Sequence, residues 1–156
     1  MSTAAIRFLE EAGVEFETYD YEVDEAVGEG YGEAVALAIG AEPERVFKTL
    51  LAEIDGSHVV VAIIPVSQRL STKALARVAG GKKASLADRS DAARLTGYLP
   101  GGISPFGQRR SLPTFVDETV ERFATVFVSG GKRGLQVELA PSDLIRLTRA
   151  KVAPLT

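Results

Sequence analysis

The chain of 156 residues contains no cysteine, no tryptophan and a single histidine, His58. The lack of cysteine excludes disulfides, thiolate metal sites and a cysteine nucleophile. A serine triad would need His58 as its base, but His58 directly follows a turn signal, where a solvated histidine is the common case. Catalytic zinc sites need about two or three imidazole or thiolate ligands. We therefore expect no metal and no cofactor, and any enzyme of this sequence must work without the usual histidine base.

Long apolar runs are also missing. No segment approaches the roughly 20 apolar residues that a membrane helix needs. The N-terminal MSTAAIRFLEE lacks the basic flank and apolar block of a secretory signal. We therefore expect no membrane partner and a cytoplasmic location. The dinucleotide fingerprint GxGxxG after a strand and the phosphate loop GxxxxGK[ST] are absent as well, which argues against nucleotide chemistry of those types.

Charge is unevenly distributed along the chain. Residues 1–44 contain one basic residue against twelve acidic ones, a net charge of −11, whereas residues 45–156 carry a net charge of +8. The basic portion is compatible with a polyanionic partner. The alternative is that the two portions neutralise each other across the fold.

Apolar spacing, caps and turn signals predict one domain over residues 1–156. Helices are expected over about 4–12, 33–40, 72–80, 88–97 and 142–150, with a short one over 118–123. Strands are expected over about 14–23, 46–54, 58–66, 82–87, 113–117, 124–130 and 135–139. The sequence DGS between the second and third strands is a hairpin signal. This order favours an α+β fold with a mixed or mostly antiparallel, strongly curved sheet.

Lys48 interrupts the run VFKTLLAEI, which otherwise has the pattern of a buried strand. Lysine is almost never fully buried without a partner. A lysine here suggests a cleft in which it binds a phosphate or carboxylate, or hydrogen-bonds a reacting carbonyl or water. The alternative is an outward-facing side chain, because alternate residues of a strand point to opposite faces.

Two glycine-rich segments are candidates for shaped backbone. GYLPGGISPFGQRRSLP, residues 97–113, cannot form a regular helix or strand, and is either a connector or a ligand-holding loop. VSGGKRGL, residues 128–135, is either a plain hairpin turn or an anion-binding nest. In the nest, the N–H groups of Gly130 and Gly131 would face an anion beside Lys132 and Arg133.

Further candidates come from residue type alone. Surface cations that could contact phosphates are Lys82, Lys83, Arg109 and Arg110. Rings that could stack on a base are Tyr21, Tyr31 and Tyr98. Apolar residues that could line a pocket are Phe47, Ile64, Leu99 and Ile103, although each also fits a plain core position.

Three segments together resemble a known family. VFKTLL, TGYLPGGISPFGQRRSLPTFVD and VSGGKRGLQVEL, in this order and spacing, are similar to the YbaK/ProX-type aminoacyl-tRNA deacylases, and most of all to the YbaK-type cysteinyl-tRNA(Pro) deacylases. The same fold forms the editing domain of many bacterial prolyl-tRNA synthetases. The resemblance covers essentially the whole chain. It implies a compact domain with a barrel-like curved sheet surrounded by helices.

The resemblance also implies site residues. The lysine that the family ties to activity corresponds to Lys48, and the family's glycine–proline loop corresponds to Gly101–Pro105. The catalytic groups implied are Lys48 and the backbone of Gly101 and Gly102. The substrate-binding residues implied are Tyr21, Asp24, Tyr98, Ile103, Ser104, Pro105, Ser129, Gly130, Gly131, Lys132 and Arg133. One departure concerns Gln136, where family members such as YbaK carry aspartate, so no acidic role is carried over there.

The activity implied is hydrolysis of the ester that joins a wrong amino acid to tRNA, most of all Cys-tRNA(Pro). An ester is easier to cleave than an amide, so binding, carbonyl polarisation and positioning of the attacking group can suffice. The attacking group is left open among a substrate thiol, a ribose hydroxyl and water. Implied partners are the acceptor end of a mischarged tRNA and prolyl-tRNA synthetase, with no DNA partner. The alternatives are a deacylase for alanine or another small residue, a non-catalytic tRNA- or synthetase-binding module, and a small-molecule phosphate binder.

Overall fold

A computed structural model of the chain describes residues 2–23 and 30–156. Helices in these ranges are α1 (Ala4–Ala12), α2 (Tyr31–Ile39), α3 (Thr72–Val78), α4 (Arg89–Thr96) and α5 (Pro141–Thr148), with two short 3-10 helices, η1 (Pro43–Arg45) and η2 (Glu118–Arg122). Strands are β1 (Glu17–Asp20), β2 (Phe47–Ile54), β3 (His58–Pro65), β4 (Ala84–Leu86), β5 (Thr114–Asp117), β6 (Val126–Ser129), β7 (Leu135–Leu139) and β8 (Lys151–Ala153).

The described strands form two sheets. One has the order β1-β7-β6 and is antiparallel throughout. The other has the order β4-β2-β3-β5-β8, in which β3, β5 and β8 run parallel and the other pairs are antiparallel. A single bridge between Val46 and Phe127 joins the two sheets at the start of β2. The α+β class with mixed strands is therefore confirmed, but the sheets do not close into a barrel.

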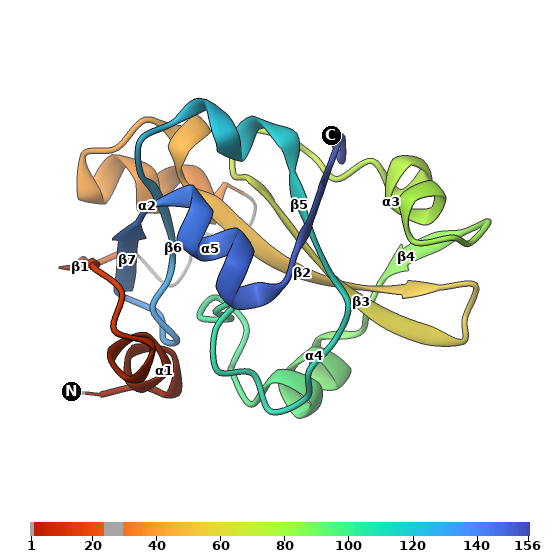
Figure 1. Cartoon of the computed structure of the whole chain (residues 1–156), viewed down its shortest axis with the longest axis horizontal. Helices are drawn as coiled ribbons and strands as arrows, with labels where there is room; N and C mark the ends of the chain where they lie inside the picture. Colours follow the sequence, from red (N-terminus) through yellow and green to blue (C-terminus); the bar gives the residue numbers. More distant parts are fainter. Residues whose placement is uncertain (1, 24–29) are drawn as a thin grey trace.

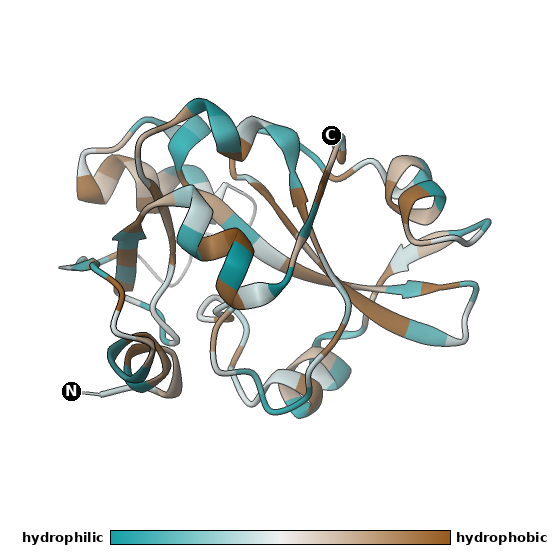
Figure 2. Ribbon diagram, viewed as in Figure 1, coloured by the Kyte–Doolittle hydropathy of each residue, from teal (hydrophilic) through white to brown (hydrophobic). Residues whose placement is uncertain are grey.

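The β2–β3 hairpin is the longest feature of the fold. Figure 1 shows it crossing the molecule, with the three-stranded sheet at one end and α3 and β4 at the other. Its continuous apolar sequence is explained by burial on both faces. Phe47 and Leu51 pack in one core cluster, and Ala52 and Ile54 in another. Hydrophobic residues accordingly run along both strands in Figure 2.

Side-chain caps and glycines set the ends of several helices. The side chains of Thr3, Ser71 and Asp88 accept hydrogen bonds from the first turns of α1, α3 and α4. Gly13 and Gly97 end α1 and α4 in the left-handed conformation, which costs glycine no Cβ strain. Local chemistry therefore positions these helices as the sequence predicts.

Three elements differ from expectation. The first strand covers only Glu17–Asp20, because only this part pairs with β7. Helix α2 begins at Tyr31, two residues earlier than predicted, and β8 is not among the expected strands. The expected acidic loop falls largely on residues 24–29, which lie outside the described residues. None of the described helices has the length and apolar character needed to cross a bilayer.

Candidate active site

A cavity of about 470 Å³ lies over an edge of β2. Strand β4 pairs only with Ala52–Ile54, so the earlier part of this edge has no β4 partner. Lining residues come from β2 (Phe47–Leu51), from α2 and its start (Gly30, Tyr31, Gly32, Val35), from β4 to α4 (Leu86, Ala87, Arg89, Ala92), from the 97–113 segment (Pro100, Gly101, Ile103) and from β6 and β7 (Ser129, Gln136). Its size is typical of a small-molecule site, about 300–1,000 Å³.

The edge of β2 also turns backbone groups toward this cavity. The amide of Val66 donates to the carbonyl of Val46 at 2.8 Å. Following the β2–β3 register from this pair, the backbone N–H and C=O groups of the even-numbered residues of β2 point toward β3. Hydrogen-bonding directions alternate along an antiparallel pair. The N–H and C=O of Thr49 therefore point away from β3, toward the cavity.

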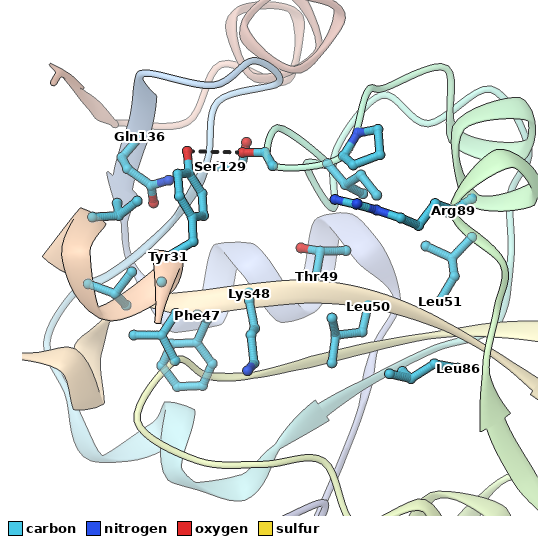
Figure 3. A pocket seen from close by; sticks show the side chains of 18 of the residues that line it. Tyr31, Phe47, Lys48, Thr49, Leu50, Leu51, Leu86, Arg89, Ser129 and Gln136 are labelled. Atoms are coloured by element: carbon cyan, nitrogen blue, oxygen red, sulfur yellow. Dashed lines mark hydrogen bonds between the residues drawn. The ribbon is translucent and has the colours of Figure 1, made fainter. Parts of the chain in front are cut away.

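Lys48 and Thr49 leave β2 on opposite sides. Figure 3 shows Thr49 on the side of Tyr31, Ser129 and Gln136, and Lys48 on the side of Leu86. Lys48 also lines a second hollow of about 630 Å³, whose other walls include Glu33, Ser67, Gln68, Arg69 and Thr72. The lysine therefore lies where the cavity continues into a more polar groove.

The Lys48 ammonium makes no hydrogen bond or ion pair with any other residue in the described ranges. Its partial burial lowers its pKa, the positive charge of Arg69 lowers it further, and Glu33 acts in the opposite direction. The structure therefore places Lys48 in a cleft, as the sequence predicts. A half-buried cation with which no described residue forms an ion pair is suited to bind an anionic or carbonyl group of a ligand.

A chain of hydrogen bonds crosses one wall of the cavity. The amide nitrogen of Gln136 lies 3.5 Å from the Tyr21 hydroxyl, which lies 3.3 Å from the Tyr31 hydroxyl. The Tyr31 hydroxyl donates to the carbonyl of Gly101 at 3.4 Å, the dashed line of Figure 3. Burial and the hydrogen bond to Tyr21 raise the pKa of Tyr31, so it stays protonated and can donate. The chain links β7, α2 and the 97–113 segment.

The two glycine-rich loops pack backbone to backbone. A Cβ added to Gly102 would lie 2.7 Å from the Cα of Lys132 and 2.8 Å from the nitrogen of Arg133. The Gly102 amide donates to the carbonyl of Leu99 at 3.0 Å, which closes a turn. Gly101 lines the cavity, whereas Gly102 does not. The expected carbonyl-polarising role of the Gly102 amide therefore does not fit, and its place is explained by the close approach of the loops.

The expected anion nest at VSGGKRGL is not free to bind an anion. The Gly130 amide donates to the carbonyl of Leu135 at 2.8 Å, and the Gly131 amide donates to the hydroxyl of Ser129 at 3.1 Å. Lys132 lines a different hollow, beside α1 and β1. The Arg133 guanidinium lies over the Tyr31 ring, 4.2 Å from its centroid. The segment is a hairpin turn that contributes Ser129 and the Arg133–Tyr31 contact to the site.

Other predicted site residues have structural roles. Tyr98 is buried, burial raises its pKa to about 12, and its hydroxyl donates to the carbonyl of Phe106, so it does not stack on a ligand. Ser104 is fully buried and its hydroxyl accepts from the Phe106 amide at 3.2 Å. Neither residue lines the cavity, and neither does Pro105.

Of the remaining predicted residues, some line the cavity and others do not. Phe47 and Ile103 line the cavity as expected. Ile64 instead belongs to the second core cluster, and Leu99 is exposed on the surface outside the cavity. Tyr21 joins the site through its hydroxyl, and Asp24 lies outside the described residues.

The chain matches the family model of the aminoacyl-tRNA editing domain over residues 30–147. The chain belongs to this family. An editing domain of this kind removes amino acids from tRNA, so membership identifies an aminoacyl-tRNA deacylase and confirms the resemblance seen in the sequence. The match spans all the cavity-lining residues.

Relatives of the editing domain cover nearly its whole length. This chain is 37% identical to the candidate Cys-tRNA(Pro)/Cys-tRNA(Cys) deacylase EbsC of Enterococcus faecalis, and the alignment covers 99% of this chain and 93% of the relative. This chain is 29% identical to the uncharacterised protein YwhH of Bacillus subtilis, and the alignment covers 88% of this chain and 82% of the relative. A crystal structure described as a candidate trans-editing enzyme for prolyl-tRNA synthetase superposes with a TM-score of 0.86 at 26% identity. The superposition covers 100% of this chain and 98% of that protein.

Sequence reasoning misses several residues that line the cavity. Thr49, Arg89 and Leu86 line the cavity without any pattern that marks them. Gln136 stands out in the sequence only as a departure from the family. His58 is exposed at the turn end of the hairpin, where Ser57 contacts its ring nitrogen. Among residues 2–23 and 30–156, no group of three or more acidic, histidine or cysteine side chains could hold a metal ion.

Proposed function

We propose that this editing domain hydrolyses the ester of a mischarged tRNA, with the aminoacyl group in the cavity and the RNA end in the adjoining groove. The observation that carries the proposal is the position of Lys48, a half-buried cation where the two hollows meet. The cavity side has mostly apolar walls with a few polar groups and Arg89, and its size suits a small amino acid. The groove side carries polar groups and the cations Lys48 and Arg69 beside the carboxylate of Glu33, which suits a sugar–phosphate chain.

The chemistry needs no protein nucleophile. An attacking oxygen or sulfur adds to the ester carbonyl, the bond to the ribose oxygen breaks, and the ribose regains its hydroxyl. If a substrate thiol attacks first, water completes the release of the amino acid. Lys48 would stabilise negative charge on the phosphate or the carbonyl oxygen. The backbone at Gly101 and at the free β2 edge would orient the carbonyl.

We further propose Cys-tRNA(Pro) as the substrate, with prolyl-tRNA synthetase supplying the tRNA. Support comes from the name of the 37% identical relative and from the description of the structural neighbour. A pocket walled by Phe47, Val35 and Ile103 discriminates by size, which is a weak lever of about 1–3 kcal/mol per methylene. Alanine or another small residue is the alternative substrate.

The test is deacylation of Cys-, Ala-, Ser- and Pro-tRNA(Pro), with and without prolyl-tRNA synthetase. We expect fastest release of cysteine, and a loss of about 100-fold or more in Lys48→Ala, the scale on which one charge-stabilising group contributes to catalysis. Lys73→Ala, at an exposed position in α3, is the matched control and should behave as wild type. Full activity of Lys48→Ala would overturn the role of the lysine. Salt-sensitive tRNA binding without turnover of any ester would support a binding module instead.

A further inference from the structure

Two buried polar atoms in the cavity wall have no hydrogen-bond partner among the described residues. Thr49 is 7% exposed and Gln136 is 6% exposed, and both line the cavity. The Thr49 hydroxyl and the Gln136 carbonyl oxygen each lack any partner in the described residues. Burying such a group without a hydrogen bond is unfavourable, and native proteins rarely leave it so. Two in one cavity point to a ligand that supplies the missing partners, since the Gln136 oxygen can only accept and the Thr49 hydroxyl can accept or donate.

The directions of the neighbouring hydrogen bonds show which atom of the Gln136 side-chain amide has no partner among the described residues. The carbonyl of Gly101 can only accept, so the Tyr31 hydroxyl donates to it. Tyr31 must then accept from Tyr21, and Tyr21 in turn accepts from the Gln136 amide nitrogen. This relay holds the side-chain nitrogen toward Tyr21. The carbonyl oxygen is therefore fixed as the free acceptor of the cavity wall.

The geometry points to a neutral subsite for the α-amino group of the aminoacyl ester, formed by Thr49 and Gln136. We propose this as the group that fills both orphan acceptors, and the inference rests on the proposed function. An ammonium carries three donors on one atom, and a hydroxyl and an amide oxygen can each take one. Figure 3 shows both side chains on the same side of β2, away from Lys48, with Arg89 lining the same side of the cavity.

The amino group suits these acceptors better than the substrate side chain does. A thiol is a weak donor, and an alanine methyl is none. The α-amino group is common to every aminoacyl ester, so its recognition does not depend on which amino acid is removed. Gln136 and Thr49 are uncharged, so the subsite binds the amine through hydrogen bonds rather than an ion pair. An N-acylated substrate would leave at least one acceptor unfilled and would add bulk beside Thr49 and Gln136.

The test uses a stable amide in place of the ester. Binding of 3′-deoxy-3′-(L-alanylamino)adenosine and of its N-acetyl derivative is measured by calorimetry for the full chain. We expect the free amine to bind about 10- to 100-fold more tightly, the range of one or two hydrogen bonds to a charged group. Thr49→Val and Gln136→Met should each reduce this ratio, by up to about 10-fold. Thr18→Val, the same change at an exposed strand position, should leave it unchanged.

Thermal unfolding adds a readout that a purely structural threonine would not give. Thr49→Val removes an unsatisfied buried hydroxyl at constant shape, so the melting temperature should be equal to or above that of wild type. A lower melting temperature, or an unchanged binding ratio in both variants, would overturn the inference. Because the probe is not hydrolysed, selective amine binding without turnover of any aminoacyl-tRNA would refute the proposed function and leave the subsite standing.

Discussion

Three side chains at this site carry a polar group that has no hydrogen bond or ion pair in the described residues. Lys48 makes no hydrogen bond or ion pair in the described residues, and the Thr49 hydroxyl and the Gln136 carbonyl oxygen have no hydrogen-bond partner there. The sequence predicts the lysine, because a charge inside an apolar run is visible without a structure. It cannot predict the orphan acceptors, since a threonine in a strand usually satisfies its hydroxyl and only the three-dimensional surroundings show that this one does not.

The pH dependence of activity should follow Lys48. Burial and Arg69 lower its pKa, so the ammonium deprotonates at a pH below that of a free lysine. If the cation is required, kcat/KM falls as pH rises through this folded-state pKa. Arginine stays protonated at all accessible pH values. Lys48→Arg should therefore be slower, since the guanidinium differs in shape, but its alkaline decline should move to higher pH.

The measurement is the pH profile of deacylation after subtraction of the uncatalysed ester hydrolysis. A decline at the same pH in wild type and Lys48→Arg would assign it to another group. The stability of Lys48→Met gives an independent check. The lowered pKa means that the charged form is penalised in the folded state, so this variant should be more stable than wild type at neutral pH. The difference should fade as pH rises through the folded-state pKa.

At the scale of elements, the parts defined by local chemistry can be predicted and the parts defined by distant contacts cannot. Helices with a capping side chain and the DGS hairpin depend on a few neighbouring residues. Strand β8 depends on pairing with β5, and the buried Asp117 carboxylate accepts from the Leu155 amide at 2.9 Å beyond its end. The motif predicts that the Gly130 amide binds an anion, but Leu135 occupies it within the same hairpin. Such local competition is invisible in a motif.

Packing between the two glycine loops should matter for both stability and activity. Gly102→Ala places a methyl group against the backbone of Lys132 and Arg133, which cannot move as a flexible side chain would. We expect a loss of about 1–3 kcal/mol in the free energy of unfolding, the usual cost of overpacking. The displaced loop carries Gly101, so kcat/KM should fall about 10-fold or more.

Gly80→Ala is the matched control for this variant. Gly80 has a φ of +80° and nothing within 4 Å of an added Cβ, so alanine there is strained without a collision. It should cost about 1–2 kcal/mol of stability and leave kcat/KM unchanged. Denaturant unfolding and deacylation of both variants give the comparison. Retention of full kcat/KM in Gly102→Ala would return the 97–113 segment to the role of a connector.

At the scale of the whole molecule, the charge distribution and the site together suggest how tRNA is held. The first 44 residues carry a net charge of −11 and the rest +8, so binding to a polyanion has to use a local cationic surface. Arg109 and Arg110 are exposed in the segment that also carries Gly101 and Ile103 of the cavity wall. Their amides donate to the carbonyls of Thr96 and Leu95 in α4, which fixes them beside that helix. This surface is suited to the phosphates next to the acceptor end.

The salt dependence of tRNA binding tests that surface. Each phosphate that the protein no longer neutralises should reduce the slope of log K against log salt by about 0.7–0.9, so Arg110→Gln should lower both affinity and slope. Arg122→Gln is the control, because Arg122 is also exposed but belongs to η2, which directly follows β5 and lies on the opposite side of the molecule from α4 (Figure 1). It has the same change in net charge and should leave the slope unchanged. Equal slopes for the two variants would mean that long-range attraction, rather than binding at the 97–113 segment, accounts for the salt effect, and the RNA would then have to approach the cavity from another side.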